Sequence, residues 1–152
     1  MEPRINYSAV EPGVVRAMLG LHTYLEKSGL EPALLDLVYL RGSQMNGCAY
    51  CVDMHSKDLR AKGGSEQKVY LTAAWRESPL FSERERAALA WTEAVTALGR
   101  EGVPDDVYEQ AREQFSEAEL VNLTLAVVAI NGWNRLNIAF RIPAGSYRAA
   151  GS

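Results

Sequence analysis

Apolar residues recur at helical spacing along most of the chain. The first stripe, at i, i+4, i+7 and i+11, consists of Val14, Met18, Leu21 and Leu25. Gly29 marks the end of this helix, and Pro32 suits the first turn of a second one that Asn46 and Gly47 break. A third helix is expected from about Cys48 to Ala61, because Gly63 and Gly64 follow it.

The second half of the chain carries helix-start signals in front of further apolar stripes. The expected helices are a fourth from Ser65 through Trp75, a fifth from Ser82 through Leu98, a sixth from Pro104 to about Gln114, and a long final helix after Ser116. Ser82 with Glu85, and Ser116 with Glu119, match the capping-box pattern. No segment shows sustained alternation of apolar and polar residues, so the predicted fold class is all-α.

Length and composition narrow the class of protein. A chain of 152 residues is the size of one domain, and we expect residues 1–152 to form a single domain. The 47% hydrophobic and 23% charged content excludes a disordered chain. The net charge of −3 comes without a basic stripe, so we expect no nucleic-acid partner.

Neither a targeting signal nor a membrane span is expected. The first residues carry acids and prolines where a signal peptide has a positive end and an apolar run. The most hydrophobic stretch, residues 120–140, is interrupted by several asparagines and an arginine. We therefore expect a cytoplasmic protein with no membrane partner.

The candidate reactive residues are Cys48, Cys51 and His55. Offsets of 0, 3 and 7 place all three on one face of a helix, spread over roughly 60°. Unpaired N–H groups at a helix N-terminus stabilise a thiolate, which favours Cys48 as the more acidic thiol. His55, one turn beyond Cys51, favours Cys51 as the thiol that is deprotonated on demand. The arrangement supplies a nucleophile, a resolving thiol and a base, which indicates a redox site.

Two other interpretations of these residues stay open. The cysteines could be inert core residues, since cysteine is often buried. They could also bind zinc together with His55, with Asp36 or His22 as the fourth ligand, although the usual spacing of a structural zinc site is absent. His22 by itself is interpreted as a surface or interface residue and is left out of the predicted redox site.

The motif SQMNGCAYC at residues 43–51, followed by His55, resembles the signature of the alkylhydroperoxidase AhpD family within the carboxymuconolactone decarboxylase superfamily. Segments similar to that family continue along the chain at residues 74–77 (AWRE), 90–94 (AWTEA) and 130–135 (INGWNR). The Tyr50 between the cysteines, where the best-known peroxidases of the family have His, places the chain in a CAYC branch.

This resemblance implies an AhpD-like helical bundle that assembles as a trimer or hexamer. It also implies a peroxidase that needs no metal, flavin or other cofactor. Such enzymes reduce hydroperoxides through the CxxC pair and are re-reduced by a thiol carrier such as a lipoylated protein. The apolar faces of the final helix independently favour a homo-oligomer.

The resemblance also implies a carboxylate in the proton relay, twelve residues before Cys48. That position is Asp36 here, where the family usually has Glu, so the side chain loses about 1.5 Å of reach and requires a water or a shifted helix to contact its partner. Glu93 in the fifth helix is a second hypothesis for the missing carboxylate function.

The expected activity is a cysteine-based alkyl hydroperoxide reductase with Cys51 attacking and Cys48 resolving. A thiol–disulfide exchange or redox-sensor protein on the same scaffold is the first alternative. A lactone decarboxylase of the same superfamily is the second, and the paired thiols argue against it because that branch does not generally rely on a CxxC pair.

Overall fold

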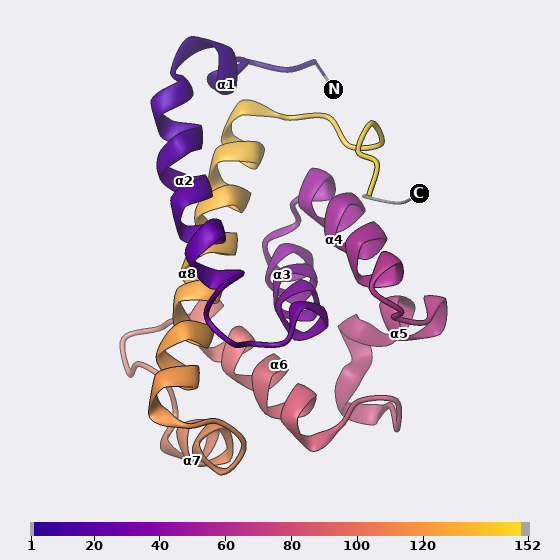
Figure 1. The fold of residues 1–152 in the computed structure, drawn as a ribbon, viewed down its shortest axis with the longest axis vertical. Coiled ribbons are helices and arrows are strands. Elements are labelled where there is room, and N and C mark those ends of the chain that lie inside the picture. The colour runs from indigo at the N-terminus through magenta and orange to yellow at the C-terminus, as the bar shows by residue number, and fades with distance from the viewer. Residues whose placement is uncertain (1, 150–152) are drawn as a thin grey trace.

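The computed structural model describes residues 2–149, and within that range the protein is built from helices and loops (Figure 1). The elements in chain order are α1 (Tyr7–Val10), α2 (Pro12–Leu25), α3 (Pro32–Asn46), α4 (Ala49–Ala61), α5 (Glu66–Leu71), the 3₁₀ helix η1 (Thr72–Glu77), α6 (Glu83–Thr96), α7 (Asp105–Gln114) and α8 (Glu117–Phe140). No strand occurs in the described range, where an isolated bridge joins Gly99 and Gly102. The all-α prediction is confirmed; residues 1 and 150–152 of the predicted domain lie outside the described range.

Helix α3 is the centre of the fold. It packs against α4 on one side and against α6 and α8 on the others, as its position in the middle of Figure 1 shows. Its apolar residues occupy most of its circumference, and Leu37, Val38 and Leu40 are fully buried. Because a helix that is apolar on most faces requires neighbours on most faces, its sequence directs it to the interior.

Helix α8 is the longest element and lies along both α2 and α3. The predicted capping box forms: the Ser116 hydroxyl accepts from the Glu119 N–H, and the Glu119 carboxylate accepts from the Ser116 N–H. Gly132 allows α2 to approach closely, since a β-carbon at that position would lie 2.8 Å from the methyl carbon of Met18. The long α8 thus reaches from the α7 end of the molecule to the end where α4 begins (Figure 1).

Three predicted boundaries differ from the structure. The short α1 was not predicted, because four residues are too few to show an apolar repeat; Asn6 caps it by accepting from the Ala9 N–H. The fourth predicted helix is two elements, α5 and η1, and Ala74 inside η1 has non-helical dihedral angles. The fifth ends at Thr96, which leaves Leu98 in the following turn, 61% exposed.

The N-terminal segment and the segment after α8 both contact other elements near the end of α8. The Arg4 N–H donates to the Phe140 carbonyl at 3.0 Å, which joins the N-terminal segment to the end of α8. Residues 141–149, called the C-terminal segment below, run from α8 towards α4 (Figure 1). The Gly145 N–H of that segment donates to Asp53 in α4. Across residues 2–149, no helix is both long enough and apolar enough to span a membrane.

Candidate active site

A tight turn between α3 and α4 sets the position of the thiol pair. Gly47 has a φ of 71°, a left-handed conformation that favours glycine, and it ends α3. Cys48 follows as the N-cap of α4, and its sulfur accepts from the Cys51 N–H at 3.4 Å. The two cysteines are free thiols, one at the helix start and one inside its first turn, with His55 one turn further on.

A cavity of about 560 Å³ opens in front of this helix face, and Cys51 and His55 belong to its lining. The wall also includes the aromatic and apolar residues Tyr7, Leu19, Tyr39, Tyr50, Met54 and Trp133. No Asp, Glu, Lys or Arg is among the described residues that line it. Cys48 is absent from the lining and is only 1% exposed, so the two sulfurs are not equivalent.

The surroundings give the two thiols opposite acidities. The hydrogen bond from the Cys48 thiol lowers the pKa of Cys51 to about 6, helped by the amides of Asn137 and Asn134 and by the charge of His55. The hydrogen bond to Cys51 and then burial raise the pKa of Cys48. These contacts favour Cys51 as the more acidic thiol, in line with the argument from His55, over Cys48, which the helix N-terminus favours. The helix N-terminus favours an anion near either sulfur. Besides Cys48 and His55, the further donors that stabilise a charge on Cys51 come from outside α4.

Those donors belong to a row of buried asparagines on α8. Asn137 Nδ2 donates to Cys51 Sγ at 3.2 Å, and the Tyr7 hydroxyl donates to Asn137 Oδ1 at 2.8 Å. Asn134, fully buried, donates to the Ser43 hydroxyl and accepts from Asn46 at 2.9 Å. This row links the SQMNG part of the motif in α3 to the thiol pair.

Sequence reasoning missed the roles of Asn134 and Asn137. The signal was present, because Asn131, Asn134 and Asn137 recur every three residues in an otherwise apolar helix. A buried amide requires hydrogen-bond partners, so such a row predicts a polar network on that helix face.

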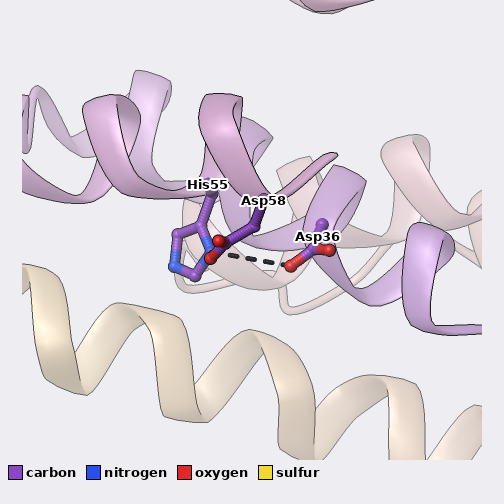
Figure 2. A group of neighbouring side chains, drawn as sticks. All are labelled: Asp36, His55 and Asp58. Carbon is purple, nitrogen blue, oxygen red and sulfur yellow. Dashed lines mark ion pairs between the residues drawn. The ribbon is translucent and has the colours of Figure 1, made fainter. Parts of the chain in front are cut away.

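Asp36 approaches His55 without contacting it directly. Asp36 is 3% exposed, and its Oδ1 lies 3.8 Å from His55 Nδ1, beyond hydrogen-bond length (Figure 2). Its other oxygen is in close contact with the Lys62 ammonium. Asp58, not considered at the sequence level, offers a second carboxylate with Oδ2 at 4.0 Å from the same nitrogen. The separation of Asp36 and His55 agrees with the reach lost when Asp replaces Glu.

The donor atoms of Asp36, His55 and Asp58 lie within 4.8 Å of one another (Figure 2). A nitrogen and two carboxylates are ligands that a divalent cation accepts. The Lys62 ammonium, however, already supplies a positive charge to Asp36. Within the described chain, neither cysteine belongs to a group of three or more metal-ligating residues, so the alternative zinc site of Cys48, Cys51 and His55 with Asp36 or His22 is not assembled.

Glu93 and His22, the two remaining residues considered from the sequence, differ in whether they line the cavity. Glu93 is not in the cavity lining; it accepts from Arg41 Nε at 2.7 Å and Trp75 Nε1 at 2.8 Å, and it pairs with Arg76. Burial opposes ionisation there, but these donors hold the pKa of Glu93 below its usual value. His22, left out of the predicted site, lines the cavity, with its ring centroid 5.9 Å from that of Tyr39.

Comparison with known proteins agrees with the fold and the motif. A Bacillus subtilis protein, the uncharacterized YdfG, is 38% identical over 91% of this chain and 95% of its own length. A crystal structure from Agrobacterium tumefaciens, of a protein of unknown function named as a candidate antioxidant defence protein AhpD, has a TM-score of 0.92 and 45% identity. It covers 96% of this chain and all of its own. An alkyl hydroperoxide reductase AhpD from Solibacter usitatus is 47% identical over 30% of this chain and 25% of its own length.

The family model of the carboxymuconolactone decarboxylase family matches residues 12–94, which span α2 to most of α6 and include Asp36, both cysteines and His55. The resemblance inferred from the motif is thus confirmed, together with the AhpD-like helical fold of the solved structure. The chain belongs to the carboxymuconolactone decarboxylase family.

Proposed function

We propose that this protein is a thiol peroxidase that reduces organic hydroperoxides. The observation that carries the proposal is the coincidence of two properties on one sulfur. Cys51 lines the apolar cavity, and its pKa is lowered to about 6, so it is largely a thiolate at neutral pH. Its partner Cys48 is buried beside it and is placed to resolve an oxidised Cys51.

The proposed cycle balances without a cofactor. The Cys51 thiolate attacks the terminal oxygen of the hydroperoxide and the O–O bond breaks, leaving a sulfenic acid and an alkoxide. His55 donates the proton that converts the alkoxide to an alcohol. The Cys48 thiol then condenses with the sulfenic acid, releasing water and forming the disulfide. An external dithiol supplies two electrons and two protons to restore both thiols.

The cavity supports a substrate with an apolar body. Its volume of about 560 Å³ far exceeds what hydrogen peroxide requires, and its described lining carries aromatic rings and no charged carboxylate, ammonium or guanidinium. Since both sulfurs are buried, the reductant must also reach them as a slender group. A dihydrolipoyl arm on a carrier protein fits that requirement, and we propose it as the electron donor.

The test is turnover of tert-butyl hydroperoxide with dihydrolipoamide, measured by stopped flow or a coupled assay for the wild type and Cys51→Ser. We expect turnover that is lost in the variant, and faster second-order reduction of the organic hydroperoxide than of hydrogen peroxide. Mass spectrometry of Cys48→Ser and Cys51→Ser after a substoichiometric peroxide pulse assigns the attacking sulfur. A stable sulfenic acid found only on Cys48 would overturn the assignment.

One observation favours a second candidate function, a redox sensor based on thiol–disulfide exchange. Asp36 stands 3.8 Å from His55 and is engaged by Lys62, which limits it as a proton relay. A sensor would cycle between dithiol and disulfide with negligible turnover for any thiol donor. Its oxidation would change assembly or partner binding, which sedimentation of the reduced and oxidised protein measures.

We also propose that the protein is a homo-oligomer. Val121 and Val128 lie seven residues apart on one face of α8 and are 68% and 53% exposed. Aliphatic side chains on a common helix face are commonly covered by a second subunit. Analytical ultracentrifugation of the wild type and of Val128→Glu tests this, with a lower mass expected for the variant.

A further inference from the structure

The buried nitrogen of His55 faces two carboxylates rather than one. Nδ1 has no hydrogen-bond partner in the structure and is shielded from solvent. Asp36 Oδ1 and Asp58 Oδ2 lie 3.8 and 4.0 Å from it, so a movement of about 1 Å brings either into hydrogen-bond range. When two carboxylates lie near a buried ring N–H, the better oriented one accepts its hydrogen bond.

The two carboxylates differ in what else they bind. Asp36 comes from α3 and is in close contact with the Lys62 ammonium, which balances its charge. Asp58 is three residues after His55 on α4, so helix geometry fixes its side chain on the same face. Its second oxygen accepts from the neutral Tyr147 hydroxyl at 2.7 Å. Asp58 is therefore bonded to an uncharged hydroxyl, whereas Asp36 is paired with an ammonium.

The C-terminal segment holds Tyr147 in that place. The Tyr147 carbonyl accepts from Lys57 at 3.2 Å, and the Gly145 N–H donates to Asp53 Oδ2 at 3.1 Å. Burial first, and then the bond to Asp58, raise the pKa of Tyr147, so its hydroxyl remains a protonated donor. Of the contacts that fasten this segment to α4, the one through Tyr147 and Asp58 continues to His55.

We propose that Asp58, oriented by the Tyr147 hydroxyl, is the positioning carboxylate of His55, so that the C-terminal segment forms part of the thiol site. This inference rests on the proposed function for its role in turnover. Asp58 fixes the proton of neutral His55 on Nδ1 and leaves the other ring nitrogen to exchange a proton with Cys51. When His55 accepts that proton, Asp58 balances the imidazolium charge until the alkoxide takes the proton away.

Several charged or titratable groups surround His55, and each variant of the test changes one of them and leaves the others intact. They are Asp36 and Tyr39 on α3, Cys51 and Asp58 on α4, and, one contact further, Lys62, Tyr147 and His22. A single substitution that removes the charge of Asp58 and keeps its shape is therefore the sharpest perturbation.

The experiment compares Asp58→Asn and Tyr147→Phe with Asp53→Asn in the full-length protein. Asp53 is the matched control, because it also fastens the C-terminal segment to α4, through Gly145 and Lys57, and no contact links it to His55. Nitrogen-15 NMR reports which ring nitrogen of His55 carries the proton, and His22→Gln assigns the signals of the two histidines. The pH profile of Cys51 alkylation provides a second readout.

We expect the Nδ1–H form of His55 to lose population in Asp58→Asn and, by a smaller amount, in Tyr147→Phe. The alkylation midpoint of Cys51 rises in Asp58→Asn by about half a unit to one unit, because less imidazolium forms beside the thiolate. Asp58→Glu restores both readouts in part, and Asp53→Asn changes neither. If Asp58→Asn or Tyr147→Phe gives the same NMR signals and midpoint as Asp53→Asn, the proposal is overturned.

These readouts separate the inference from the proposed function, because neither requires peroxide turnover. A shifted tautomer in a protein that never turns over hydroperoxide refutes the peroxidase and retains the positioning role. Full turnover by Asp58→Asn with unchanged His55 signals refutes the positioning role and retains the peroxidase.

Discussion

The Asn137 amide offers the most direct test of what makes Cys51 acidic. Its Nδ2 lies 3.2 Å from Cys51 Sγ and donates to it, while its oxygen is held by the Tyr7 hydroxyl, so the donor is fixed in orientation. Asn137→Ala removes this bond and leaves both thiols in place, while it widens the cavity wall at this position. The pKa of Cys51, now about 6, should then rise.

The size of this rise follows from the energy of a hydrogen bond to a charged group. Such a bond contributes about 1.5–3 kcal/mol. One pKa unit corresponds to about 1.4 kcal/mol, so the full bond is equivalent to a rise of about one to two units. The amide of Asn134 and the thiol of Cys48 still stabilise the thiolate in the variant, which places the expected midpoint near the lower end, at about 7.

The assay is the pH dependence of iodoacetamide alkylation, with the label on Cys51 counted by peptide mass spectrometry. The midpoint is the readout rather than the rate at one pH. A more basic thiolate is also a better nucleophile, with a Brønsted coefficient of about 0.4–0.5, and this partly offsets its lower population. Asn137→Asp, which places an acceptor and a negative charge at the same site, should raise the midpoint further than Asn137→Ala.

Asn122→Ala on the same helix is the control, because Asn122 bonds the Tyr24 hydroxyl at 3.1 Å instead of the thiol site. Circular dichroism melts establish that each variant is folded. A folded Asn137→Ala protein whose Cys51 midpoint equals that of the wild type would refute the view that α8 amides set the acidity of this thiol.

Three further predictions concern stability and are read from denaturant unfolding. Glu93→Gln should lower the free energy of unfolding by about 1–3 kcal/mol, since buried donors lose their anion. The alkylation midpoint of Cys51 should stay unchanged, and a shifted midpoint would show that Glu93 acts on the thiol site. Arg84 lowers the pKa of Glu31, and the Ser116 N–H and then Arg84 lower that of Glu119. These carboxylates therefore stabilise the fold above about pH 4.3 and lose that effect as the pH falls through their lowered values. Arg84→Met should therefore cost about 0.5–2 kcal/mol at pH 7 and less at pH 3, and an equal loss at both would contradict this. Ser116→Ala should cost about 1 kcal/mol by removing the N-cap of α8, and no loss would show that the capping box contributes nothing.

The fold was largely predictable because its signals are local. Capping boxes, first-turn prolines and glycine stops are read within a few residues, and they located α3, α4, α6, α7 and α8 to within about two residues. The errors fall where local signals weaken. The η1 segment has helical composition but bends at Ala74, and the bend is a consequence of packing against α3 and α6 that no short window of sequence contains.

The candidate site also has features that local sequence predicts and features that it does not. The shared helix face of Cys51 and His55 follows from spacing, and the turn at Gly47 follows from a glycine preceded by asparagine. The contact between Asn137 and Cys51 joins residues 86 apart in sequence, and that between Tyr147 and Asp58 joins residues 89 apart. Spacing along the chain carries no information about which distant amide or hydroxyl arrives at a given sulfur or carboxylate.

This division explains why the sequence supports an argument for each thiol as the more acidic one. A helix N-terminus acts on both sulfurs, because Cys48 is the N-cap and Cys51 lies in the first turn. The hydrogen bond between the two thiols lowers the pKa of Cys51 and raises that of Cys48, and the α8 amides and His55 add to the lowering at Cys51. Cys51 and Asn137 both line the cavity, so a donor that lowers the pKa of Cys51 belongs to the wall of the space proposed to admit a substrate. Cys48, buried and protonated, retains the proton that formation of the disulfide requires. In the proposed cycle, the α8 amides and the cavity therefore favour Cys51 as the attacking thiol, so substitutions in these surroundings should change which sulfur reacts first.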